Sequence, residues 1–118
     1  GIKPVTQARI VDVEAALKAW KPCTGARGRF VMHITDDCAD WNAGTWEVEF
    51  GDGVSEIRRS QREPQFALDI QALSQAFYGT PSARDIQRAE RVTVHDQTGF
   101  EAFVTFMSGP PMWTNDSF

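Results

Sequence analysis

Apolar residues recur along the first half of this chain with two different periods. From Val13 to Trp20 they fall at positions i, i+3, i+4 and i+7, which is the spacing of a helix that buries one face, and Asp12 is placed to cap that helix. Over residues 29–35 and 45–50 they recur at every second position, which is typical of strands that are buried on one side. In the first of these segments Phe30, Met32 and Ile34 share one face, and Val31, His33 and Thr35 share the other. The pattern therefore predicts one amphipathic helix followed by two half-buried strands.

A tight turn joins the second of these strands to a third. The pair Asp52-Gly53 favours a two-residue hairpin turn, and residues 54–60 form the returning strand. In the strand before the turn, the aromatic and branched residues share one side, whereas Glu47 and Glu49 share the other. The hairpin is therefore expected to bury one face only.

The second half of the chain begins with one more strand and a helix. Residues 65–69 alternate in the manner of a strand. Asp69 can cap a helix that runs to Gly79 and carries Leu73 and Phe77 on its inner side. The spacing thus predicts a direct passage from a strand into a helix.

Two capping boxes mark the starts of the last helices. Ser82 stands three residues before Asp85, and Thr98 stands three residues before Glu101. The expected inner residues are Ile86 and Ala89 in the first of these helices, Phe100, Phe103, Val104 and Met107 in the last, and Val92 and Val94 in a short strand between them.

This order of elements favours an α+β fold with a sheet of about five strands, mainly antiparallel. The helices are expected to pack on one face, because an antiparallel sheet can leave its other face in water. We expect a single domain over residues 1–118, with a short entry strand at 8–11 and an irregular C-terminal tail at 110–118. The open face of the sheet is then available to a partner domain.

Composition excludes several classes of protein. The formal net charge is -4 and the basic residues are scattered apart from Arg58 and Arg59, so no stripe for nucleic acid is present. No apolar run approaches the ~18 residues of a membrane-spanning helix, and no signal peptide is visible, which indicates a soluble cytoplasmic protein. Cys23 and Cys38 lack CxxC spacing, so we expect no metal site; the sequence leaves their redox state open.

Four passages of the chain, taken in order, resemble one known family. They are ARIVDV at 8–13, DDCADWNAGTW at 36–46, LDIQALSQAFYG at 68–79 and PMWTNDSF at 111–118. They resemble the C-terminal, sterol-carrier-protein-like domain of Eis-type (enhanced intracellular survival) acetyltransferases, and the likeness extends over nearly the whole chain. The stretch at 92–97 departs from the family by being more polar.

The resemblance implies a sterol-carrier-like fold that packs against the N-terminal acetyltransferase domains of the same polypeptide. Those domains, of the GNAT type, bind acetyl-coenzyme A and acetylate amines. Nothing in this chain resembles their glycine-rich pyrophosphate turn, so we expect no cofactor here and acetyl-coenzyme A in the larger protein. The chain begins at Gly1 without an initiator methionine, as a fragment that starts inside a linker does. By itself it is not expected to be an enzyme.

The resemblance also implies a catalytic role for the last residue. In this family the C-terminal carboxylate reaches the active site and accepts a proton from the substrate amine, and the likeness of the tail carries that role onto Phe118. A carboxyl with a pKa of ~3.5 and an ammonium with a pKa of ~10 differ by about 6 units, so burial must close much of this gap. In the isolated chain the alternative is a frayed tail.

Three further residues are candidates for contacting the substrate. Trp113 belongs to a stiff apolar segment that either positions the terminus or packs against its own domain. Asp36 lies in an acidic loop that could face a cationic amine, although such loops are most often turn formers in solvent. Trp41, in the same loop, could line a cleft or fill the core.

Three functions remain open at this point. The leading one is an accessory domain of an acetyl-coenzyme A-dependent amine N-acetyltransferase, which packs beside the active site and supplies the C-terminal carboxylate. The alternative is a stand-alone sterol or lipid carrier, because the fold in that form encloses an apolar tunnel. The third is an assembly module that forms a homo-oligomer. The sequence identifies neither the amine substrate nor the state of any apolar cavity.

Overall fold

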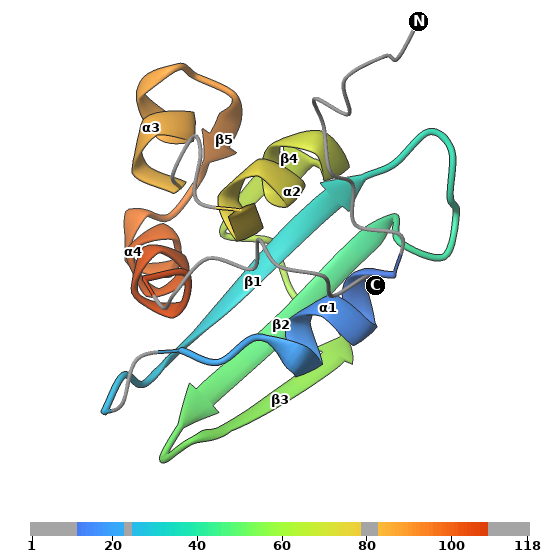
Figure 1. The fold of residues 1–118 in the computed structure, drawn as a ribbon. Coiled ribbons are helices and arrows are strands. Elements are labelled where there is room, and N and C mark those ends of the chain that lie inside the picture. Colours follow the sequence, from blue (N-terminus) through green and yellow to red (C-terminus); the bar gives the residue numbers. More distant parts are fainter. Residues whose placement is uncertain (1–11, 23–24, 79–82, 109–118) are drawn as a thin grey trace, which may run out of the picture.

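The computed structural model describes residues 12–22, 25–78 and 83–108, in which helices cover one face of a five-stranded sheet (Figure 1). The strands lie in the order β3-β2-β1-β4-β5. The α+β class expected from the sequence is confirmed. In chain order the elements are α1 (Val13–Ala19), β1 (Gly28–Thr35), β2 (Gly44–Gly51), β3 (Val54–Arg59), β4 (Phe66–Asp69), α2 (Ile70–Tyr78), α3 (Ala83–Arg88), β5 (Val92–Val94) and α4 (Gln97–Phe106).

The strand pairs are antiparallel except at the centre of the sheet. β1 runs antiparallel to β2, with Phe30 opposite Val48, but it runs parallel to β4. β2 and β3 form the predicted hairpin, in which Asp52 and Gly53 have φ angles of 52° and 77°, as a two-residue turn of this type requires. β3 also runs parallel to β4, and strands that run parallel cannot be joined by a tight turn. The chain must therefore cross β2 and β1 between β3 and β4.

The crossing segment, residues 60–65, runs over the sheet face opposite the helices. Its Arg62 lies 3.7 Å from the carboxylate of Glu47 on β2. Its Gln65 is joined twice to Val31 on β1: the Gln65 main-chain N–H donates to the Val31 carbonyl at 2.7 Å, and the Val31 N–H donates to Gln65 Oε1 at 2.9 Å. We call this segment the crossover.

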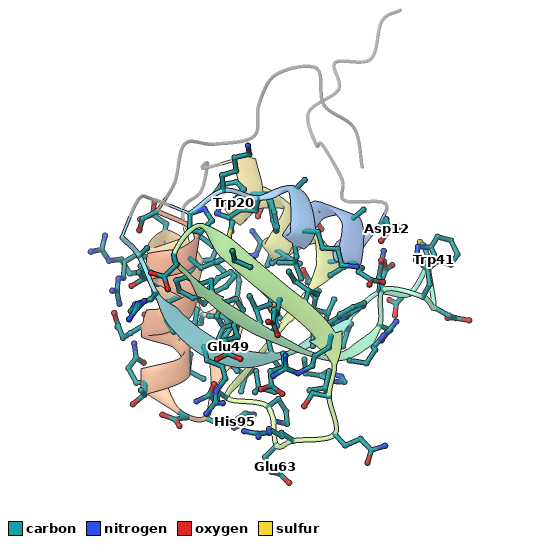
Figure 2. All side chains as sticks on the ribbon, turned by 90° about the horizontal axis from the view of Figure 1, so that it is seen from below. Asp12, Trp20, Trp41, Glu49, Glu63 and His95 are labelled. Carbon is teal, nitrogen blue, oxygen red and sulfur yellow. The ribbon has the colours of Figure 1, made fainter. Side chains whose placement is uncertain are left out.

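The crossover buries part of a face that the sequence pattern left in water. Figure 2 shows Glu63, from the crossover, on the opposite side of the molecule from Trp20. Beneath the crossover, Val31 is 5% exposed and Glu47 is 3% exposed. The face that was expected to lie in water is therefore open only in part, because the connection from β3 to β4 crosses it.

Aromatic rings fill the space between the helices and the sheet. Phe30 of β1 meets Phe66, Phe103 and Phe106 with ring centroids 5.8, 5.4 and 5.6 Å apart. Trp20, just after α1, donates from Nε1 to the carbonyl of Phe106 at 2.6 Å and so ties α1 to α4. Such ring pairs add about 0.5–1.5 kcal/mol each beyond their burial. The phenylalanines with at most 1% exposure are Phe30, Phe66, Phe77, Phe100, Phe103 and Phe106.

The start of α4 differs from the predicted capping box of Thr98 and Glu101, which was wrong. Asp96 is the N-cap, and its Oδ1 accepts the N–H of Thr98 at 3.0 Å. Gln65 Nε2 holds the other oxygen of Asp96 at 3.2 Å. Glu101 instead pairs with Arg84 of α3 at 2.7 Å, because a guanidinium is a stronger partner for a carboxylate than a main-chain N–H.

α3 is also shorter than predicted. It ends before Ala89, which is exposed and not on the inner side of the helix, so that prediction was wrong. Glu90 has a φ of 59°, and the N–H of Arg91 donates to the carbonyl of Ile86 at 3.0 Å, which closes the helix. The predicted entry strand at 8–11, the cap at Ser82, the stop at Gly79 and the tail at 110–118 lie outside the described residues.

Candidate functional site

The loop between β1 and β2, residues 36–43, is organised by a buried carboxylate. Asp36 is 7% exposed, and its Oδ1 accepts the N–H groups of Cys38 and Ala39 at 3.0 and 3.1 Å. Its Oδ2 accepts the side-chain amide of Asn42 at 3.0 Å. The carboxylate therefore closes the loop upon itself.

Asn42 connects this loop to two other elements. The side chain is fully buried, and its Oδ1 accepts the N–H of Val13 in the first turn of α1 at 2.9 Å. Its main-chain carbonyl accepts the indole N–H of Trp46 on β2 at 2.9 Å. Breaking hydrogen bonds between buried groups is costly, so Asn42 holds the loop to both the helix and the sheet.

Arg59 of β3 holds the same loop from outside. Its guanidinium carbon lies 4.0 Å from the ring centroid of Trp46, and it donates to the main-chain carbonyls of Trp41 and Ala43. Gly44 has a φ of 126°, and a Cβ there would lie 2.6 Å from Arg59 Nη1. This corner of the chain therefore requires glycine.

Of the four predicted site residues, the structure brings Asp36 and Trp41 together in one loop. The carboxylate of Asp36 is turned into the loop, which supports a turn-forming role; its contact with a substrate remains a prediction. Trp41 is 59% exposed at the outside of the loop, as Figure 2 shows, and so does not fill the core. Trp113 and Phe118 lie outside the described residues.

On the second face of the sheet, charged side chains replace apolar ones. Arg58 of β3 places its Nη2 3.1 Å from Glu47 and 3.7 Å from Glu49, and its Nη1 3.5 Å from Glu56. Only Glu47 of these carboxylates is buried. Sequence reasoning missed this cluster, although the predicted Asp52-Gly53 turn already places residue 47 opposite residue 58.

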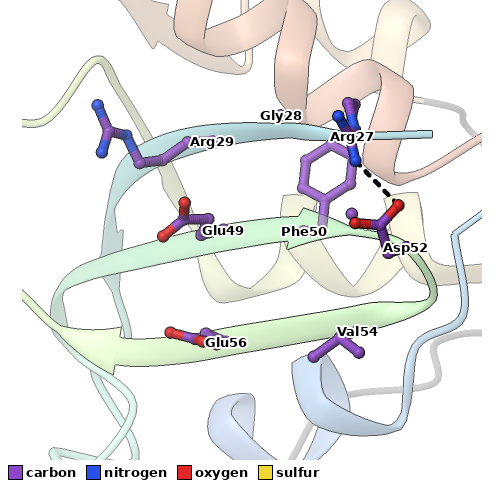
Figure 3. Close-up of a pocket in the computed structure, with 9 residues that line it drawn as sticks. Arg27, Gly28, Arg29, Glu49, Phe50, Asp52, Val54 and Glu56 are labelled. Atoms are coloured by element: carbon purple, nitrogen blue, oxygen red, sulfur yellow. Dashed lines mark hydrogen bonds and ion pairs between the residues drawn. The ribbon is translucent and has the colours of Figure 1, made fainter.

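Beyond the crossover, this face carries a hollow of about 550 Å³ at the hairpin end of the sheet (Figure 3). Arg29 and Glu49 line it from neighbouring positions on β1 and β2, with Glu56 on β3 below them in Figure 3. At its end, Arg27 pairs with Asp52 at 2.9 Å. The mixture of both signs of charge is typical of the polar rim of a protein interface more than of a site for one small anion.

The starts of α1, α2 and α4 do not fit the pyrophosphate of coenzyme A. Asp12 accepts the N–H of Ala15 at 3.1 Å and Asp69 accepts that of Ala72 at 2.7 Å, so both predicted caps are confirmed. Asp96 does the same for α4. A pyrophosphate needs free N–H groups at a helix N-terminus, and a carboxylate there both occupies the donors and repels an anion.

The described residues contain no group of three or more His, Cys, Asp or Glu side chains arranged to hold a metal ion. None of the described helices is long and apolar enough to cross a membrane. Cys38 is a free, exposed thiol, whereas Cys23 lies outside the described part of the chain.

The family of the chain follows from its match to the model of the sterol carrier protein domain. That model matches residues 13–115, so the chain belongs to this family. No curated protein matches the chain.

Several solved structures are similar to the chain. The GCN5-related N-acetyltransferase from Anabaena variabilis has a TM-score of 0.78 at 24% identity over 93% of this chain, and the one from Kribbella flavida has 0.78 at 25% over 93%. Eis1 from Mycobacterium abscessus has 0.71 at 28% over 92%. The chain spans only 28%, 28% and 26% of these three proteins, respectively.

Proposed function

We propose that this sterol carrier protein domain is the C-terminal accessory domain of an Eis-type, acetyl-coenzyme A-dependent amine N-acetyltransferase of the cytoplasm. The observation that carries the proposal is the match of almost the whole chain to about a quarter of a GCN5-related N-acetyltransferase and of Eis1, at 25% and 28% identity. In this proposal the missing acetyltransferase domains precede the chain in the same polypeptide.

The filled core favours this role over the alternative of a sterol or lipid carrier. A carrier needs an apolar space under its helices, and here that region holds the rings of Phe30, Phe66 and Phe103, all at most 1% exposed. Protein interiors packed in this way leave few voids larger than a water molecule. A lipid chain would have to displace these rings, at a cost of several kcal/mol for each ring moved out of the core.

The second sheet face supplies the surface for the acetyltransferase domains. The crossover covers one part of it, and the hollow beside Arg29 and Glu49 remains open. In this proposal the domains pack over that hollow, and the loop with Asp36 and Trp41, at the opposite end of β1 and β2, offers a second point of contact. Trp41 is held at its main chain by Arg59, so its ring is presented without the entropic cost of ordering a free loop.

Phe118 supplies the proton acceptor in this proposal, and Trp113 positions it. The support is the likeness of the tail PMWTNDSF to that of the Eis-type enzymes. The terminal carboxylate, buried beside the substrate amine, would have a raised pKa and so take the proton of the ammonium more readily. Since carboxylates occupy the starts of α1, α2 and α4, we place acetyl-coenzyme A in the acetyltransferase domains.

The test is the position of the terminal carboxylate in the complete polypeptide that carries this chain. One variant adds a glycine after Phe118, which moves the carboxylate by up to about 3.5 Å. A second deletes Phe118. Both should lower kcat for acetylation of an amine by about 100-fold, because a displacement of 1 Å can already have that effect.

Phe118→Leu is the matched variant, because it keeps the carboxylate at the same position and removes only the ring. It should retain most of the activity. Unchanged kcat after the added glycine would refute the role of the carboxylate, and saturable binding of a fluorescent fatty acid by the 118-residue chain would favour the carrier function instead.

A further inference from the structure

β3 is an edge strand of the sheet, and among the described strands it pairs only with β2 (Figure 1). We call its outer edge, at residues 54–60, the rim. The N–H of Ser60 donates to the carbonyl of Thr45, so the even-numbered residues of this strand turn their main chain toward β2. The odd-numbered residues Ser55, Ile57 and Arg59 therefore turn their N–H and C=O groups outward. The rim offers a row of main-chain donors and acceptors to another strand.

We propose that β3 pairs with β3 of a second copy of the chain, antiparallel about a two-fold axis at Ile57. In this register each Ile57 exchanges two hydrogen bonds with Ile57 of the second copy, and each Ser55 does so with Arg59 of the second copy. Glu56 then lies directly opposite Arg58 of the second copy, and the reverse pair forms by symmetry. The two sheets would join into one.

The charges on the strand select this register. A two-fold axis at residue 56 would place Glu56 opposite Glu56 of the second copy. An axis at residue 58 would place Arg58 opposite Arg58 of the second copy. Like charges directly opposite one another are destabilising, whereas the register centred on Ile57 makes two attractive pairs. It also gives the longest overlap, because residues 54–60 of both copies are then in register.

The helices in the described part of the chain leave room for this pairing. Figure 1 shows α1 lying over the face of the sheet and not beyond the rim of β3. The strand contains no proline, and Glu56 and Arg58 are both exposed. The pairing uses the rim only, so it goes beyond the proposed function and leaves the sheet face free. Since one strand from each copy is buried, we expect a reversible dimer and not a permanent one.

Sedimentation equilibrium of the 118-residue chain tests the proposal. The buffer must contain a reductant, because the exposed thiol of Cys38 would otherwise cross-link copies through a disulfide. Glu56→Arg places arginines opposite each other at both positions and should weaken the dimer by at least about tenfold. Glu63→Arg makes the same change of charge at an exposed crossover position and should leave the dimer unchanged.

A second variant, Ser55→Pro, removes an outward N–H without breaking the ladder to β2. It should also abolish the dimer, while thermal unfolding and circular dichroism report whether the monomer is folded. A chain that sediments as a monomer at millimolar concentration would overturn the proposal. So would a Glu56→Arg dimer as tight as that of Glu63→Arg.

Discussion

The two faces of the sheet are buried by different means. Under the helices, Phe30 and Phe103 belong to one continuous cluster of rings, in which each of these two has several ring neighbours. On the second face, Glu47 is buried by two arginines, Arg58 of β3 and Arg62 of the crossover. The stability of the first face depends on the volume of its side chains and on which side of each strand they lie. The stability of the second face depends on particular ion pairs.

This difference predicts different responses to mutation. Apolar packing is shared over many contacts, so the loss caused by a truncation grows with the volume removed. A buried carboxylate with few partners is stabilised only while those partners are in place, and a single change leaves the remaining charges unmatched. The following variants test whether the two faces fail in these two ways.

The largest effect is expected on the helix-covered face. Phe103→Ala removes a ring that is 1% exposed and contacts Phe30, Phe66 and Phe100 with centroids 5.0 to 5.7 Å apart. The free energy of unfolding, measured with urea, should fall by about 3–5 kcal/mol. Phe103→Leu keeps most of the volume and should lose clearly less. Equal losses would show that the response is not graded by volume.

The second face should respond to a change of charge at constant volume. Glu47→Gln removes a buried charge that Arg58 contacts at 3.1 Å, and the free energy of unfolding should fall by about 2 kcal/mol. Glu49→Gln is the matched control, since it is the same change on the same strand and face but at an exposed position. It should change the free energy by less than about 0.5 kcal/mol. Equal losses in both variants would show that burial does not make the charge of Glu47 more important than that of Glu49.

Periodicity was sufficient for the helix-covered face and insufficient for the other. The alternation in β1 and β2 correctly placed Phe30 and Val48 inward, because the phase of a strand decides which side faces the helices. It could not show that β4 runs parallel to β1, and hence that the connection at residues 60–65 covers Val31. Pairing between distant strands leaves no local pattern in the sequence.

The candidate site was predicted only in part, for a similar reason. Asp36 and Trp41 were placed in the loop after β1, but the residues that fix this loop, Asn42 and Arg59, were not recognised. Arg59 acts from another strand and through main-chain carbonyls, and such contacts carry no sequence signature. Glu101 shows the same limit, since a partner on α3 replaced the local cap that the spacing suggested.

An effect of similar size is expected where one arginine holds a loop. Gly44→Ala combines a φ of 126° with a Cβ that would lie 2.6 Å from Arg59 Nη1, so it should displace the guanidinium and cost about 2 kcal/mol. Gly53→Ala has a φ of 77° but no atom within 4 Å of the new Cβ, so it should cost about 1 kcal/mol.

Hydrogen exchange separates the two glycine variants further. Only Gly44→Ala should speed the exchange of the amides of Ala39 and Asn42, because their loop is released from Arg59. Faster exchange at these amides in Gly53→Ala as well would mean that general destabilisation, and not the loss of Arg59, opens the loop.

The smallest effect is expected from an ion pair that lies outside both buried faces. Hydrogen bonds from Arg84 and then Gln97 lower the pKa of Glu101 from 4.5 to about 2. Since the folded state binds this proton less readily than the unfolded state, the pair adds stability that is fully present above pH 4.5 and is lost as the pH falls toward 2. Solvent screens the pair, because the side chains of Arg84 and Glu101 are 39% and 48% exposed, so the gain is small.

Glu101→Gln should therefore be slightly less stable than the parent chain at neutral pH and nearly equal to it at a pH of about 2. Urea unfolding of both proteins across this range measures the difference directly. Because only residue 101 differs, the titration of every other carboxylate cancels in the comparison. A difference that stays constant with pH would assign the stabilisation to the geometry of the hydrogen bonds to Arg84 and Gln97, which glutamine can partly reproduce, and not to the charge of Glu101.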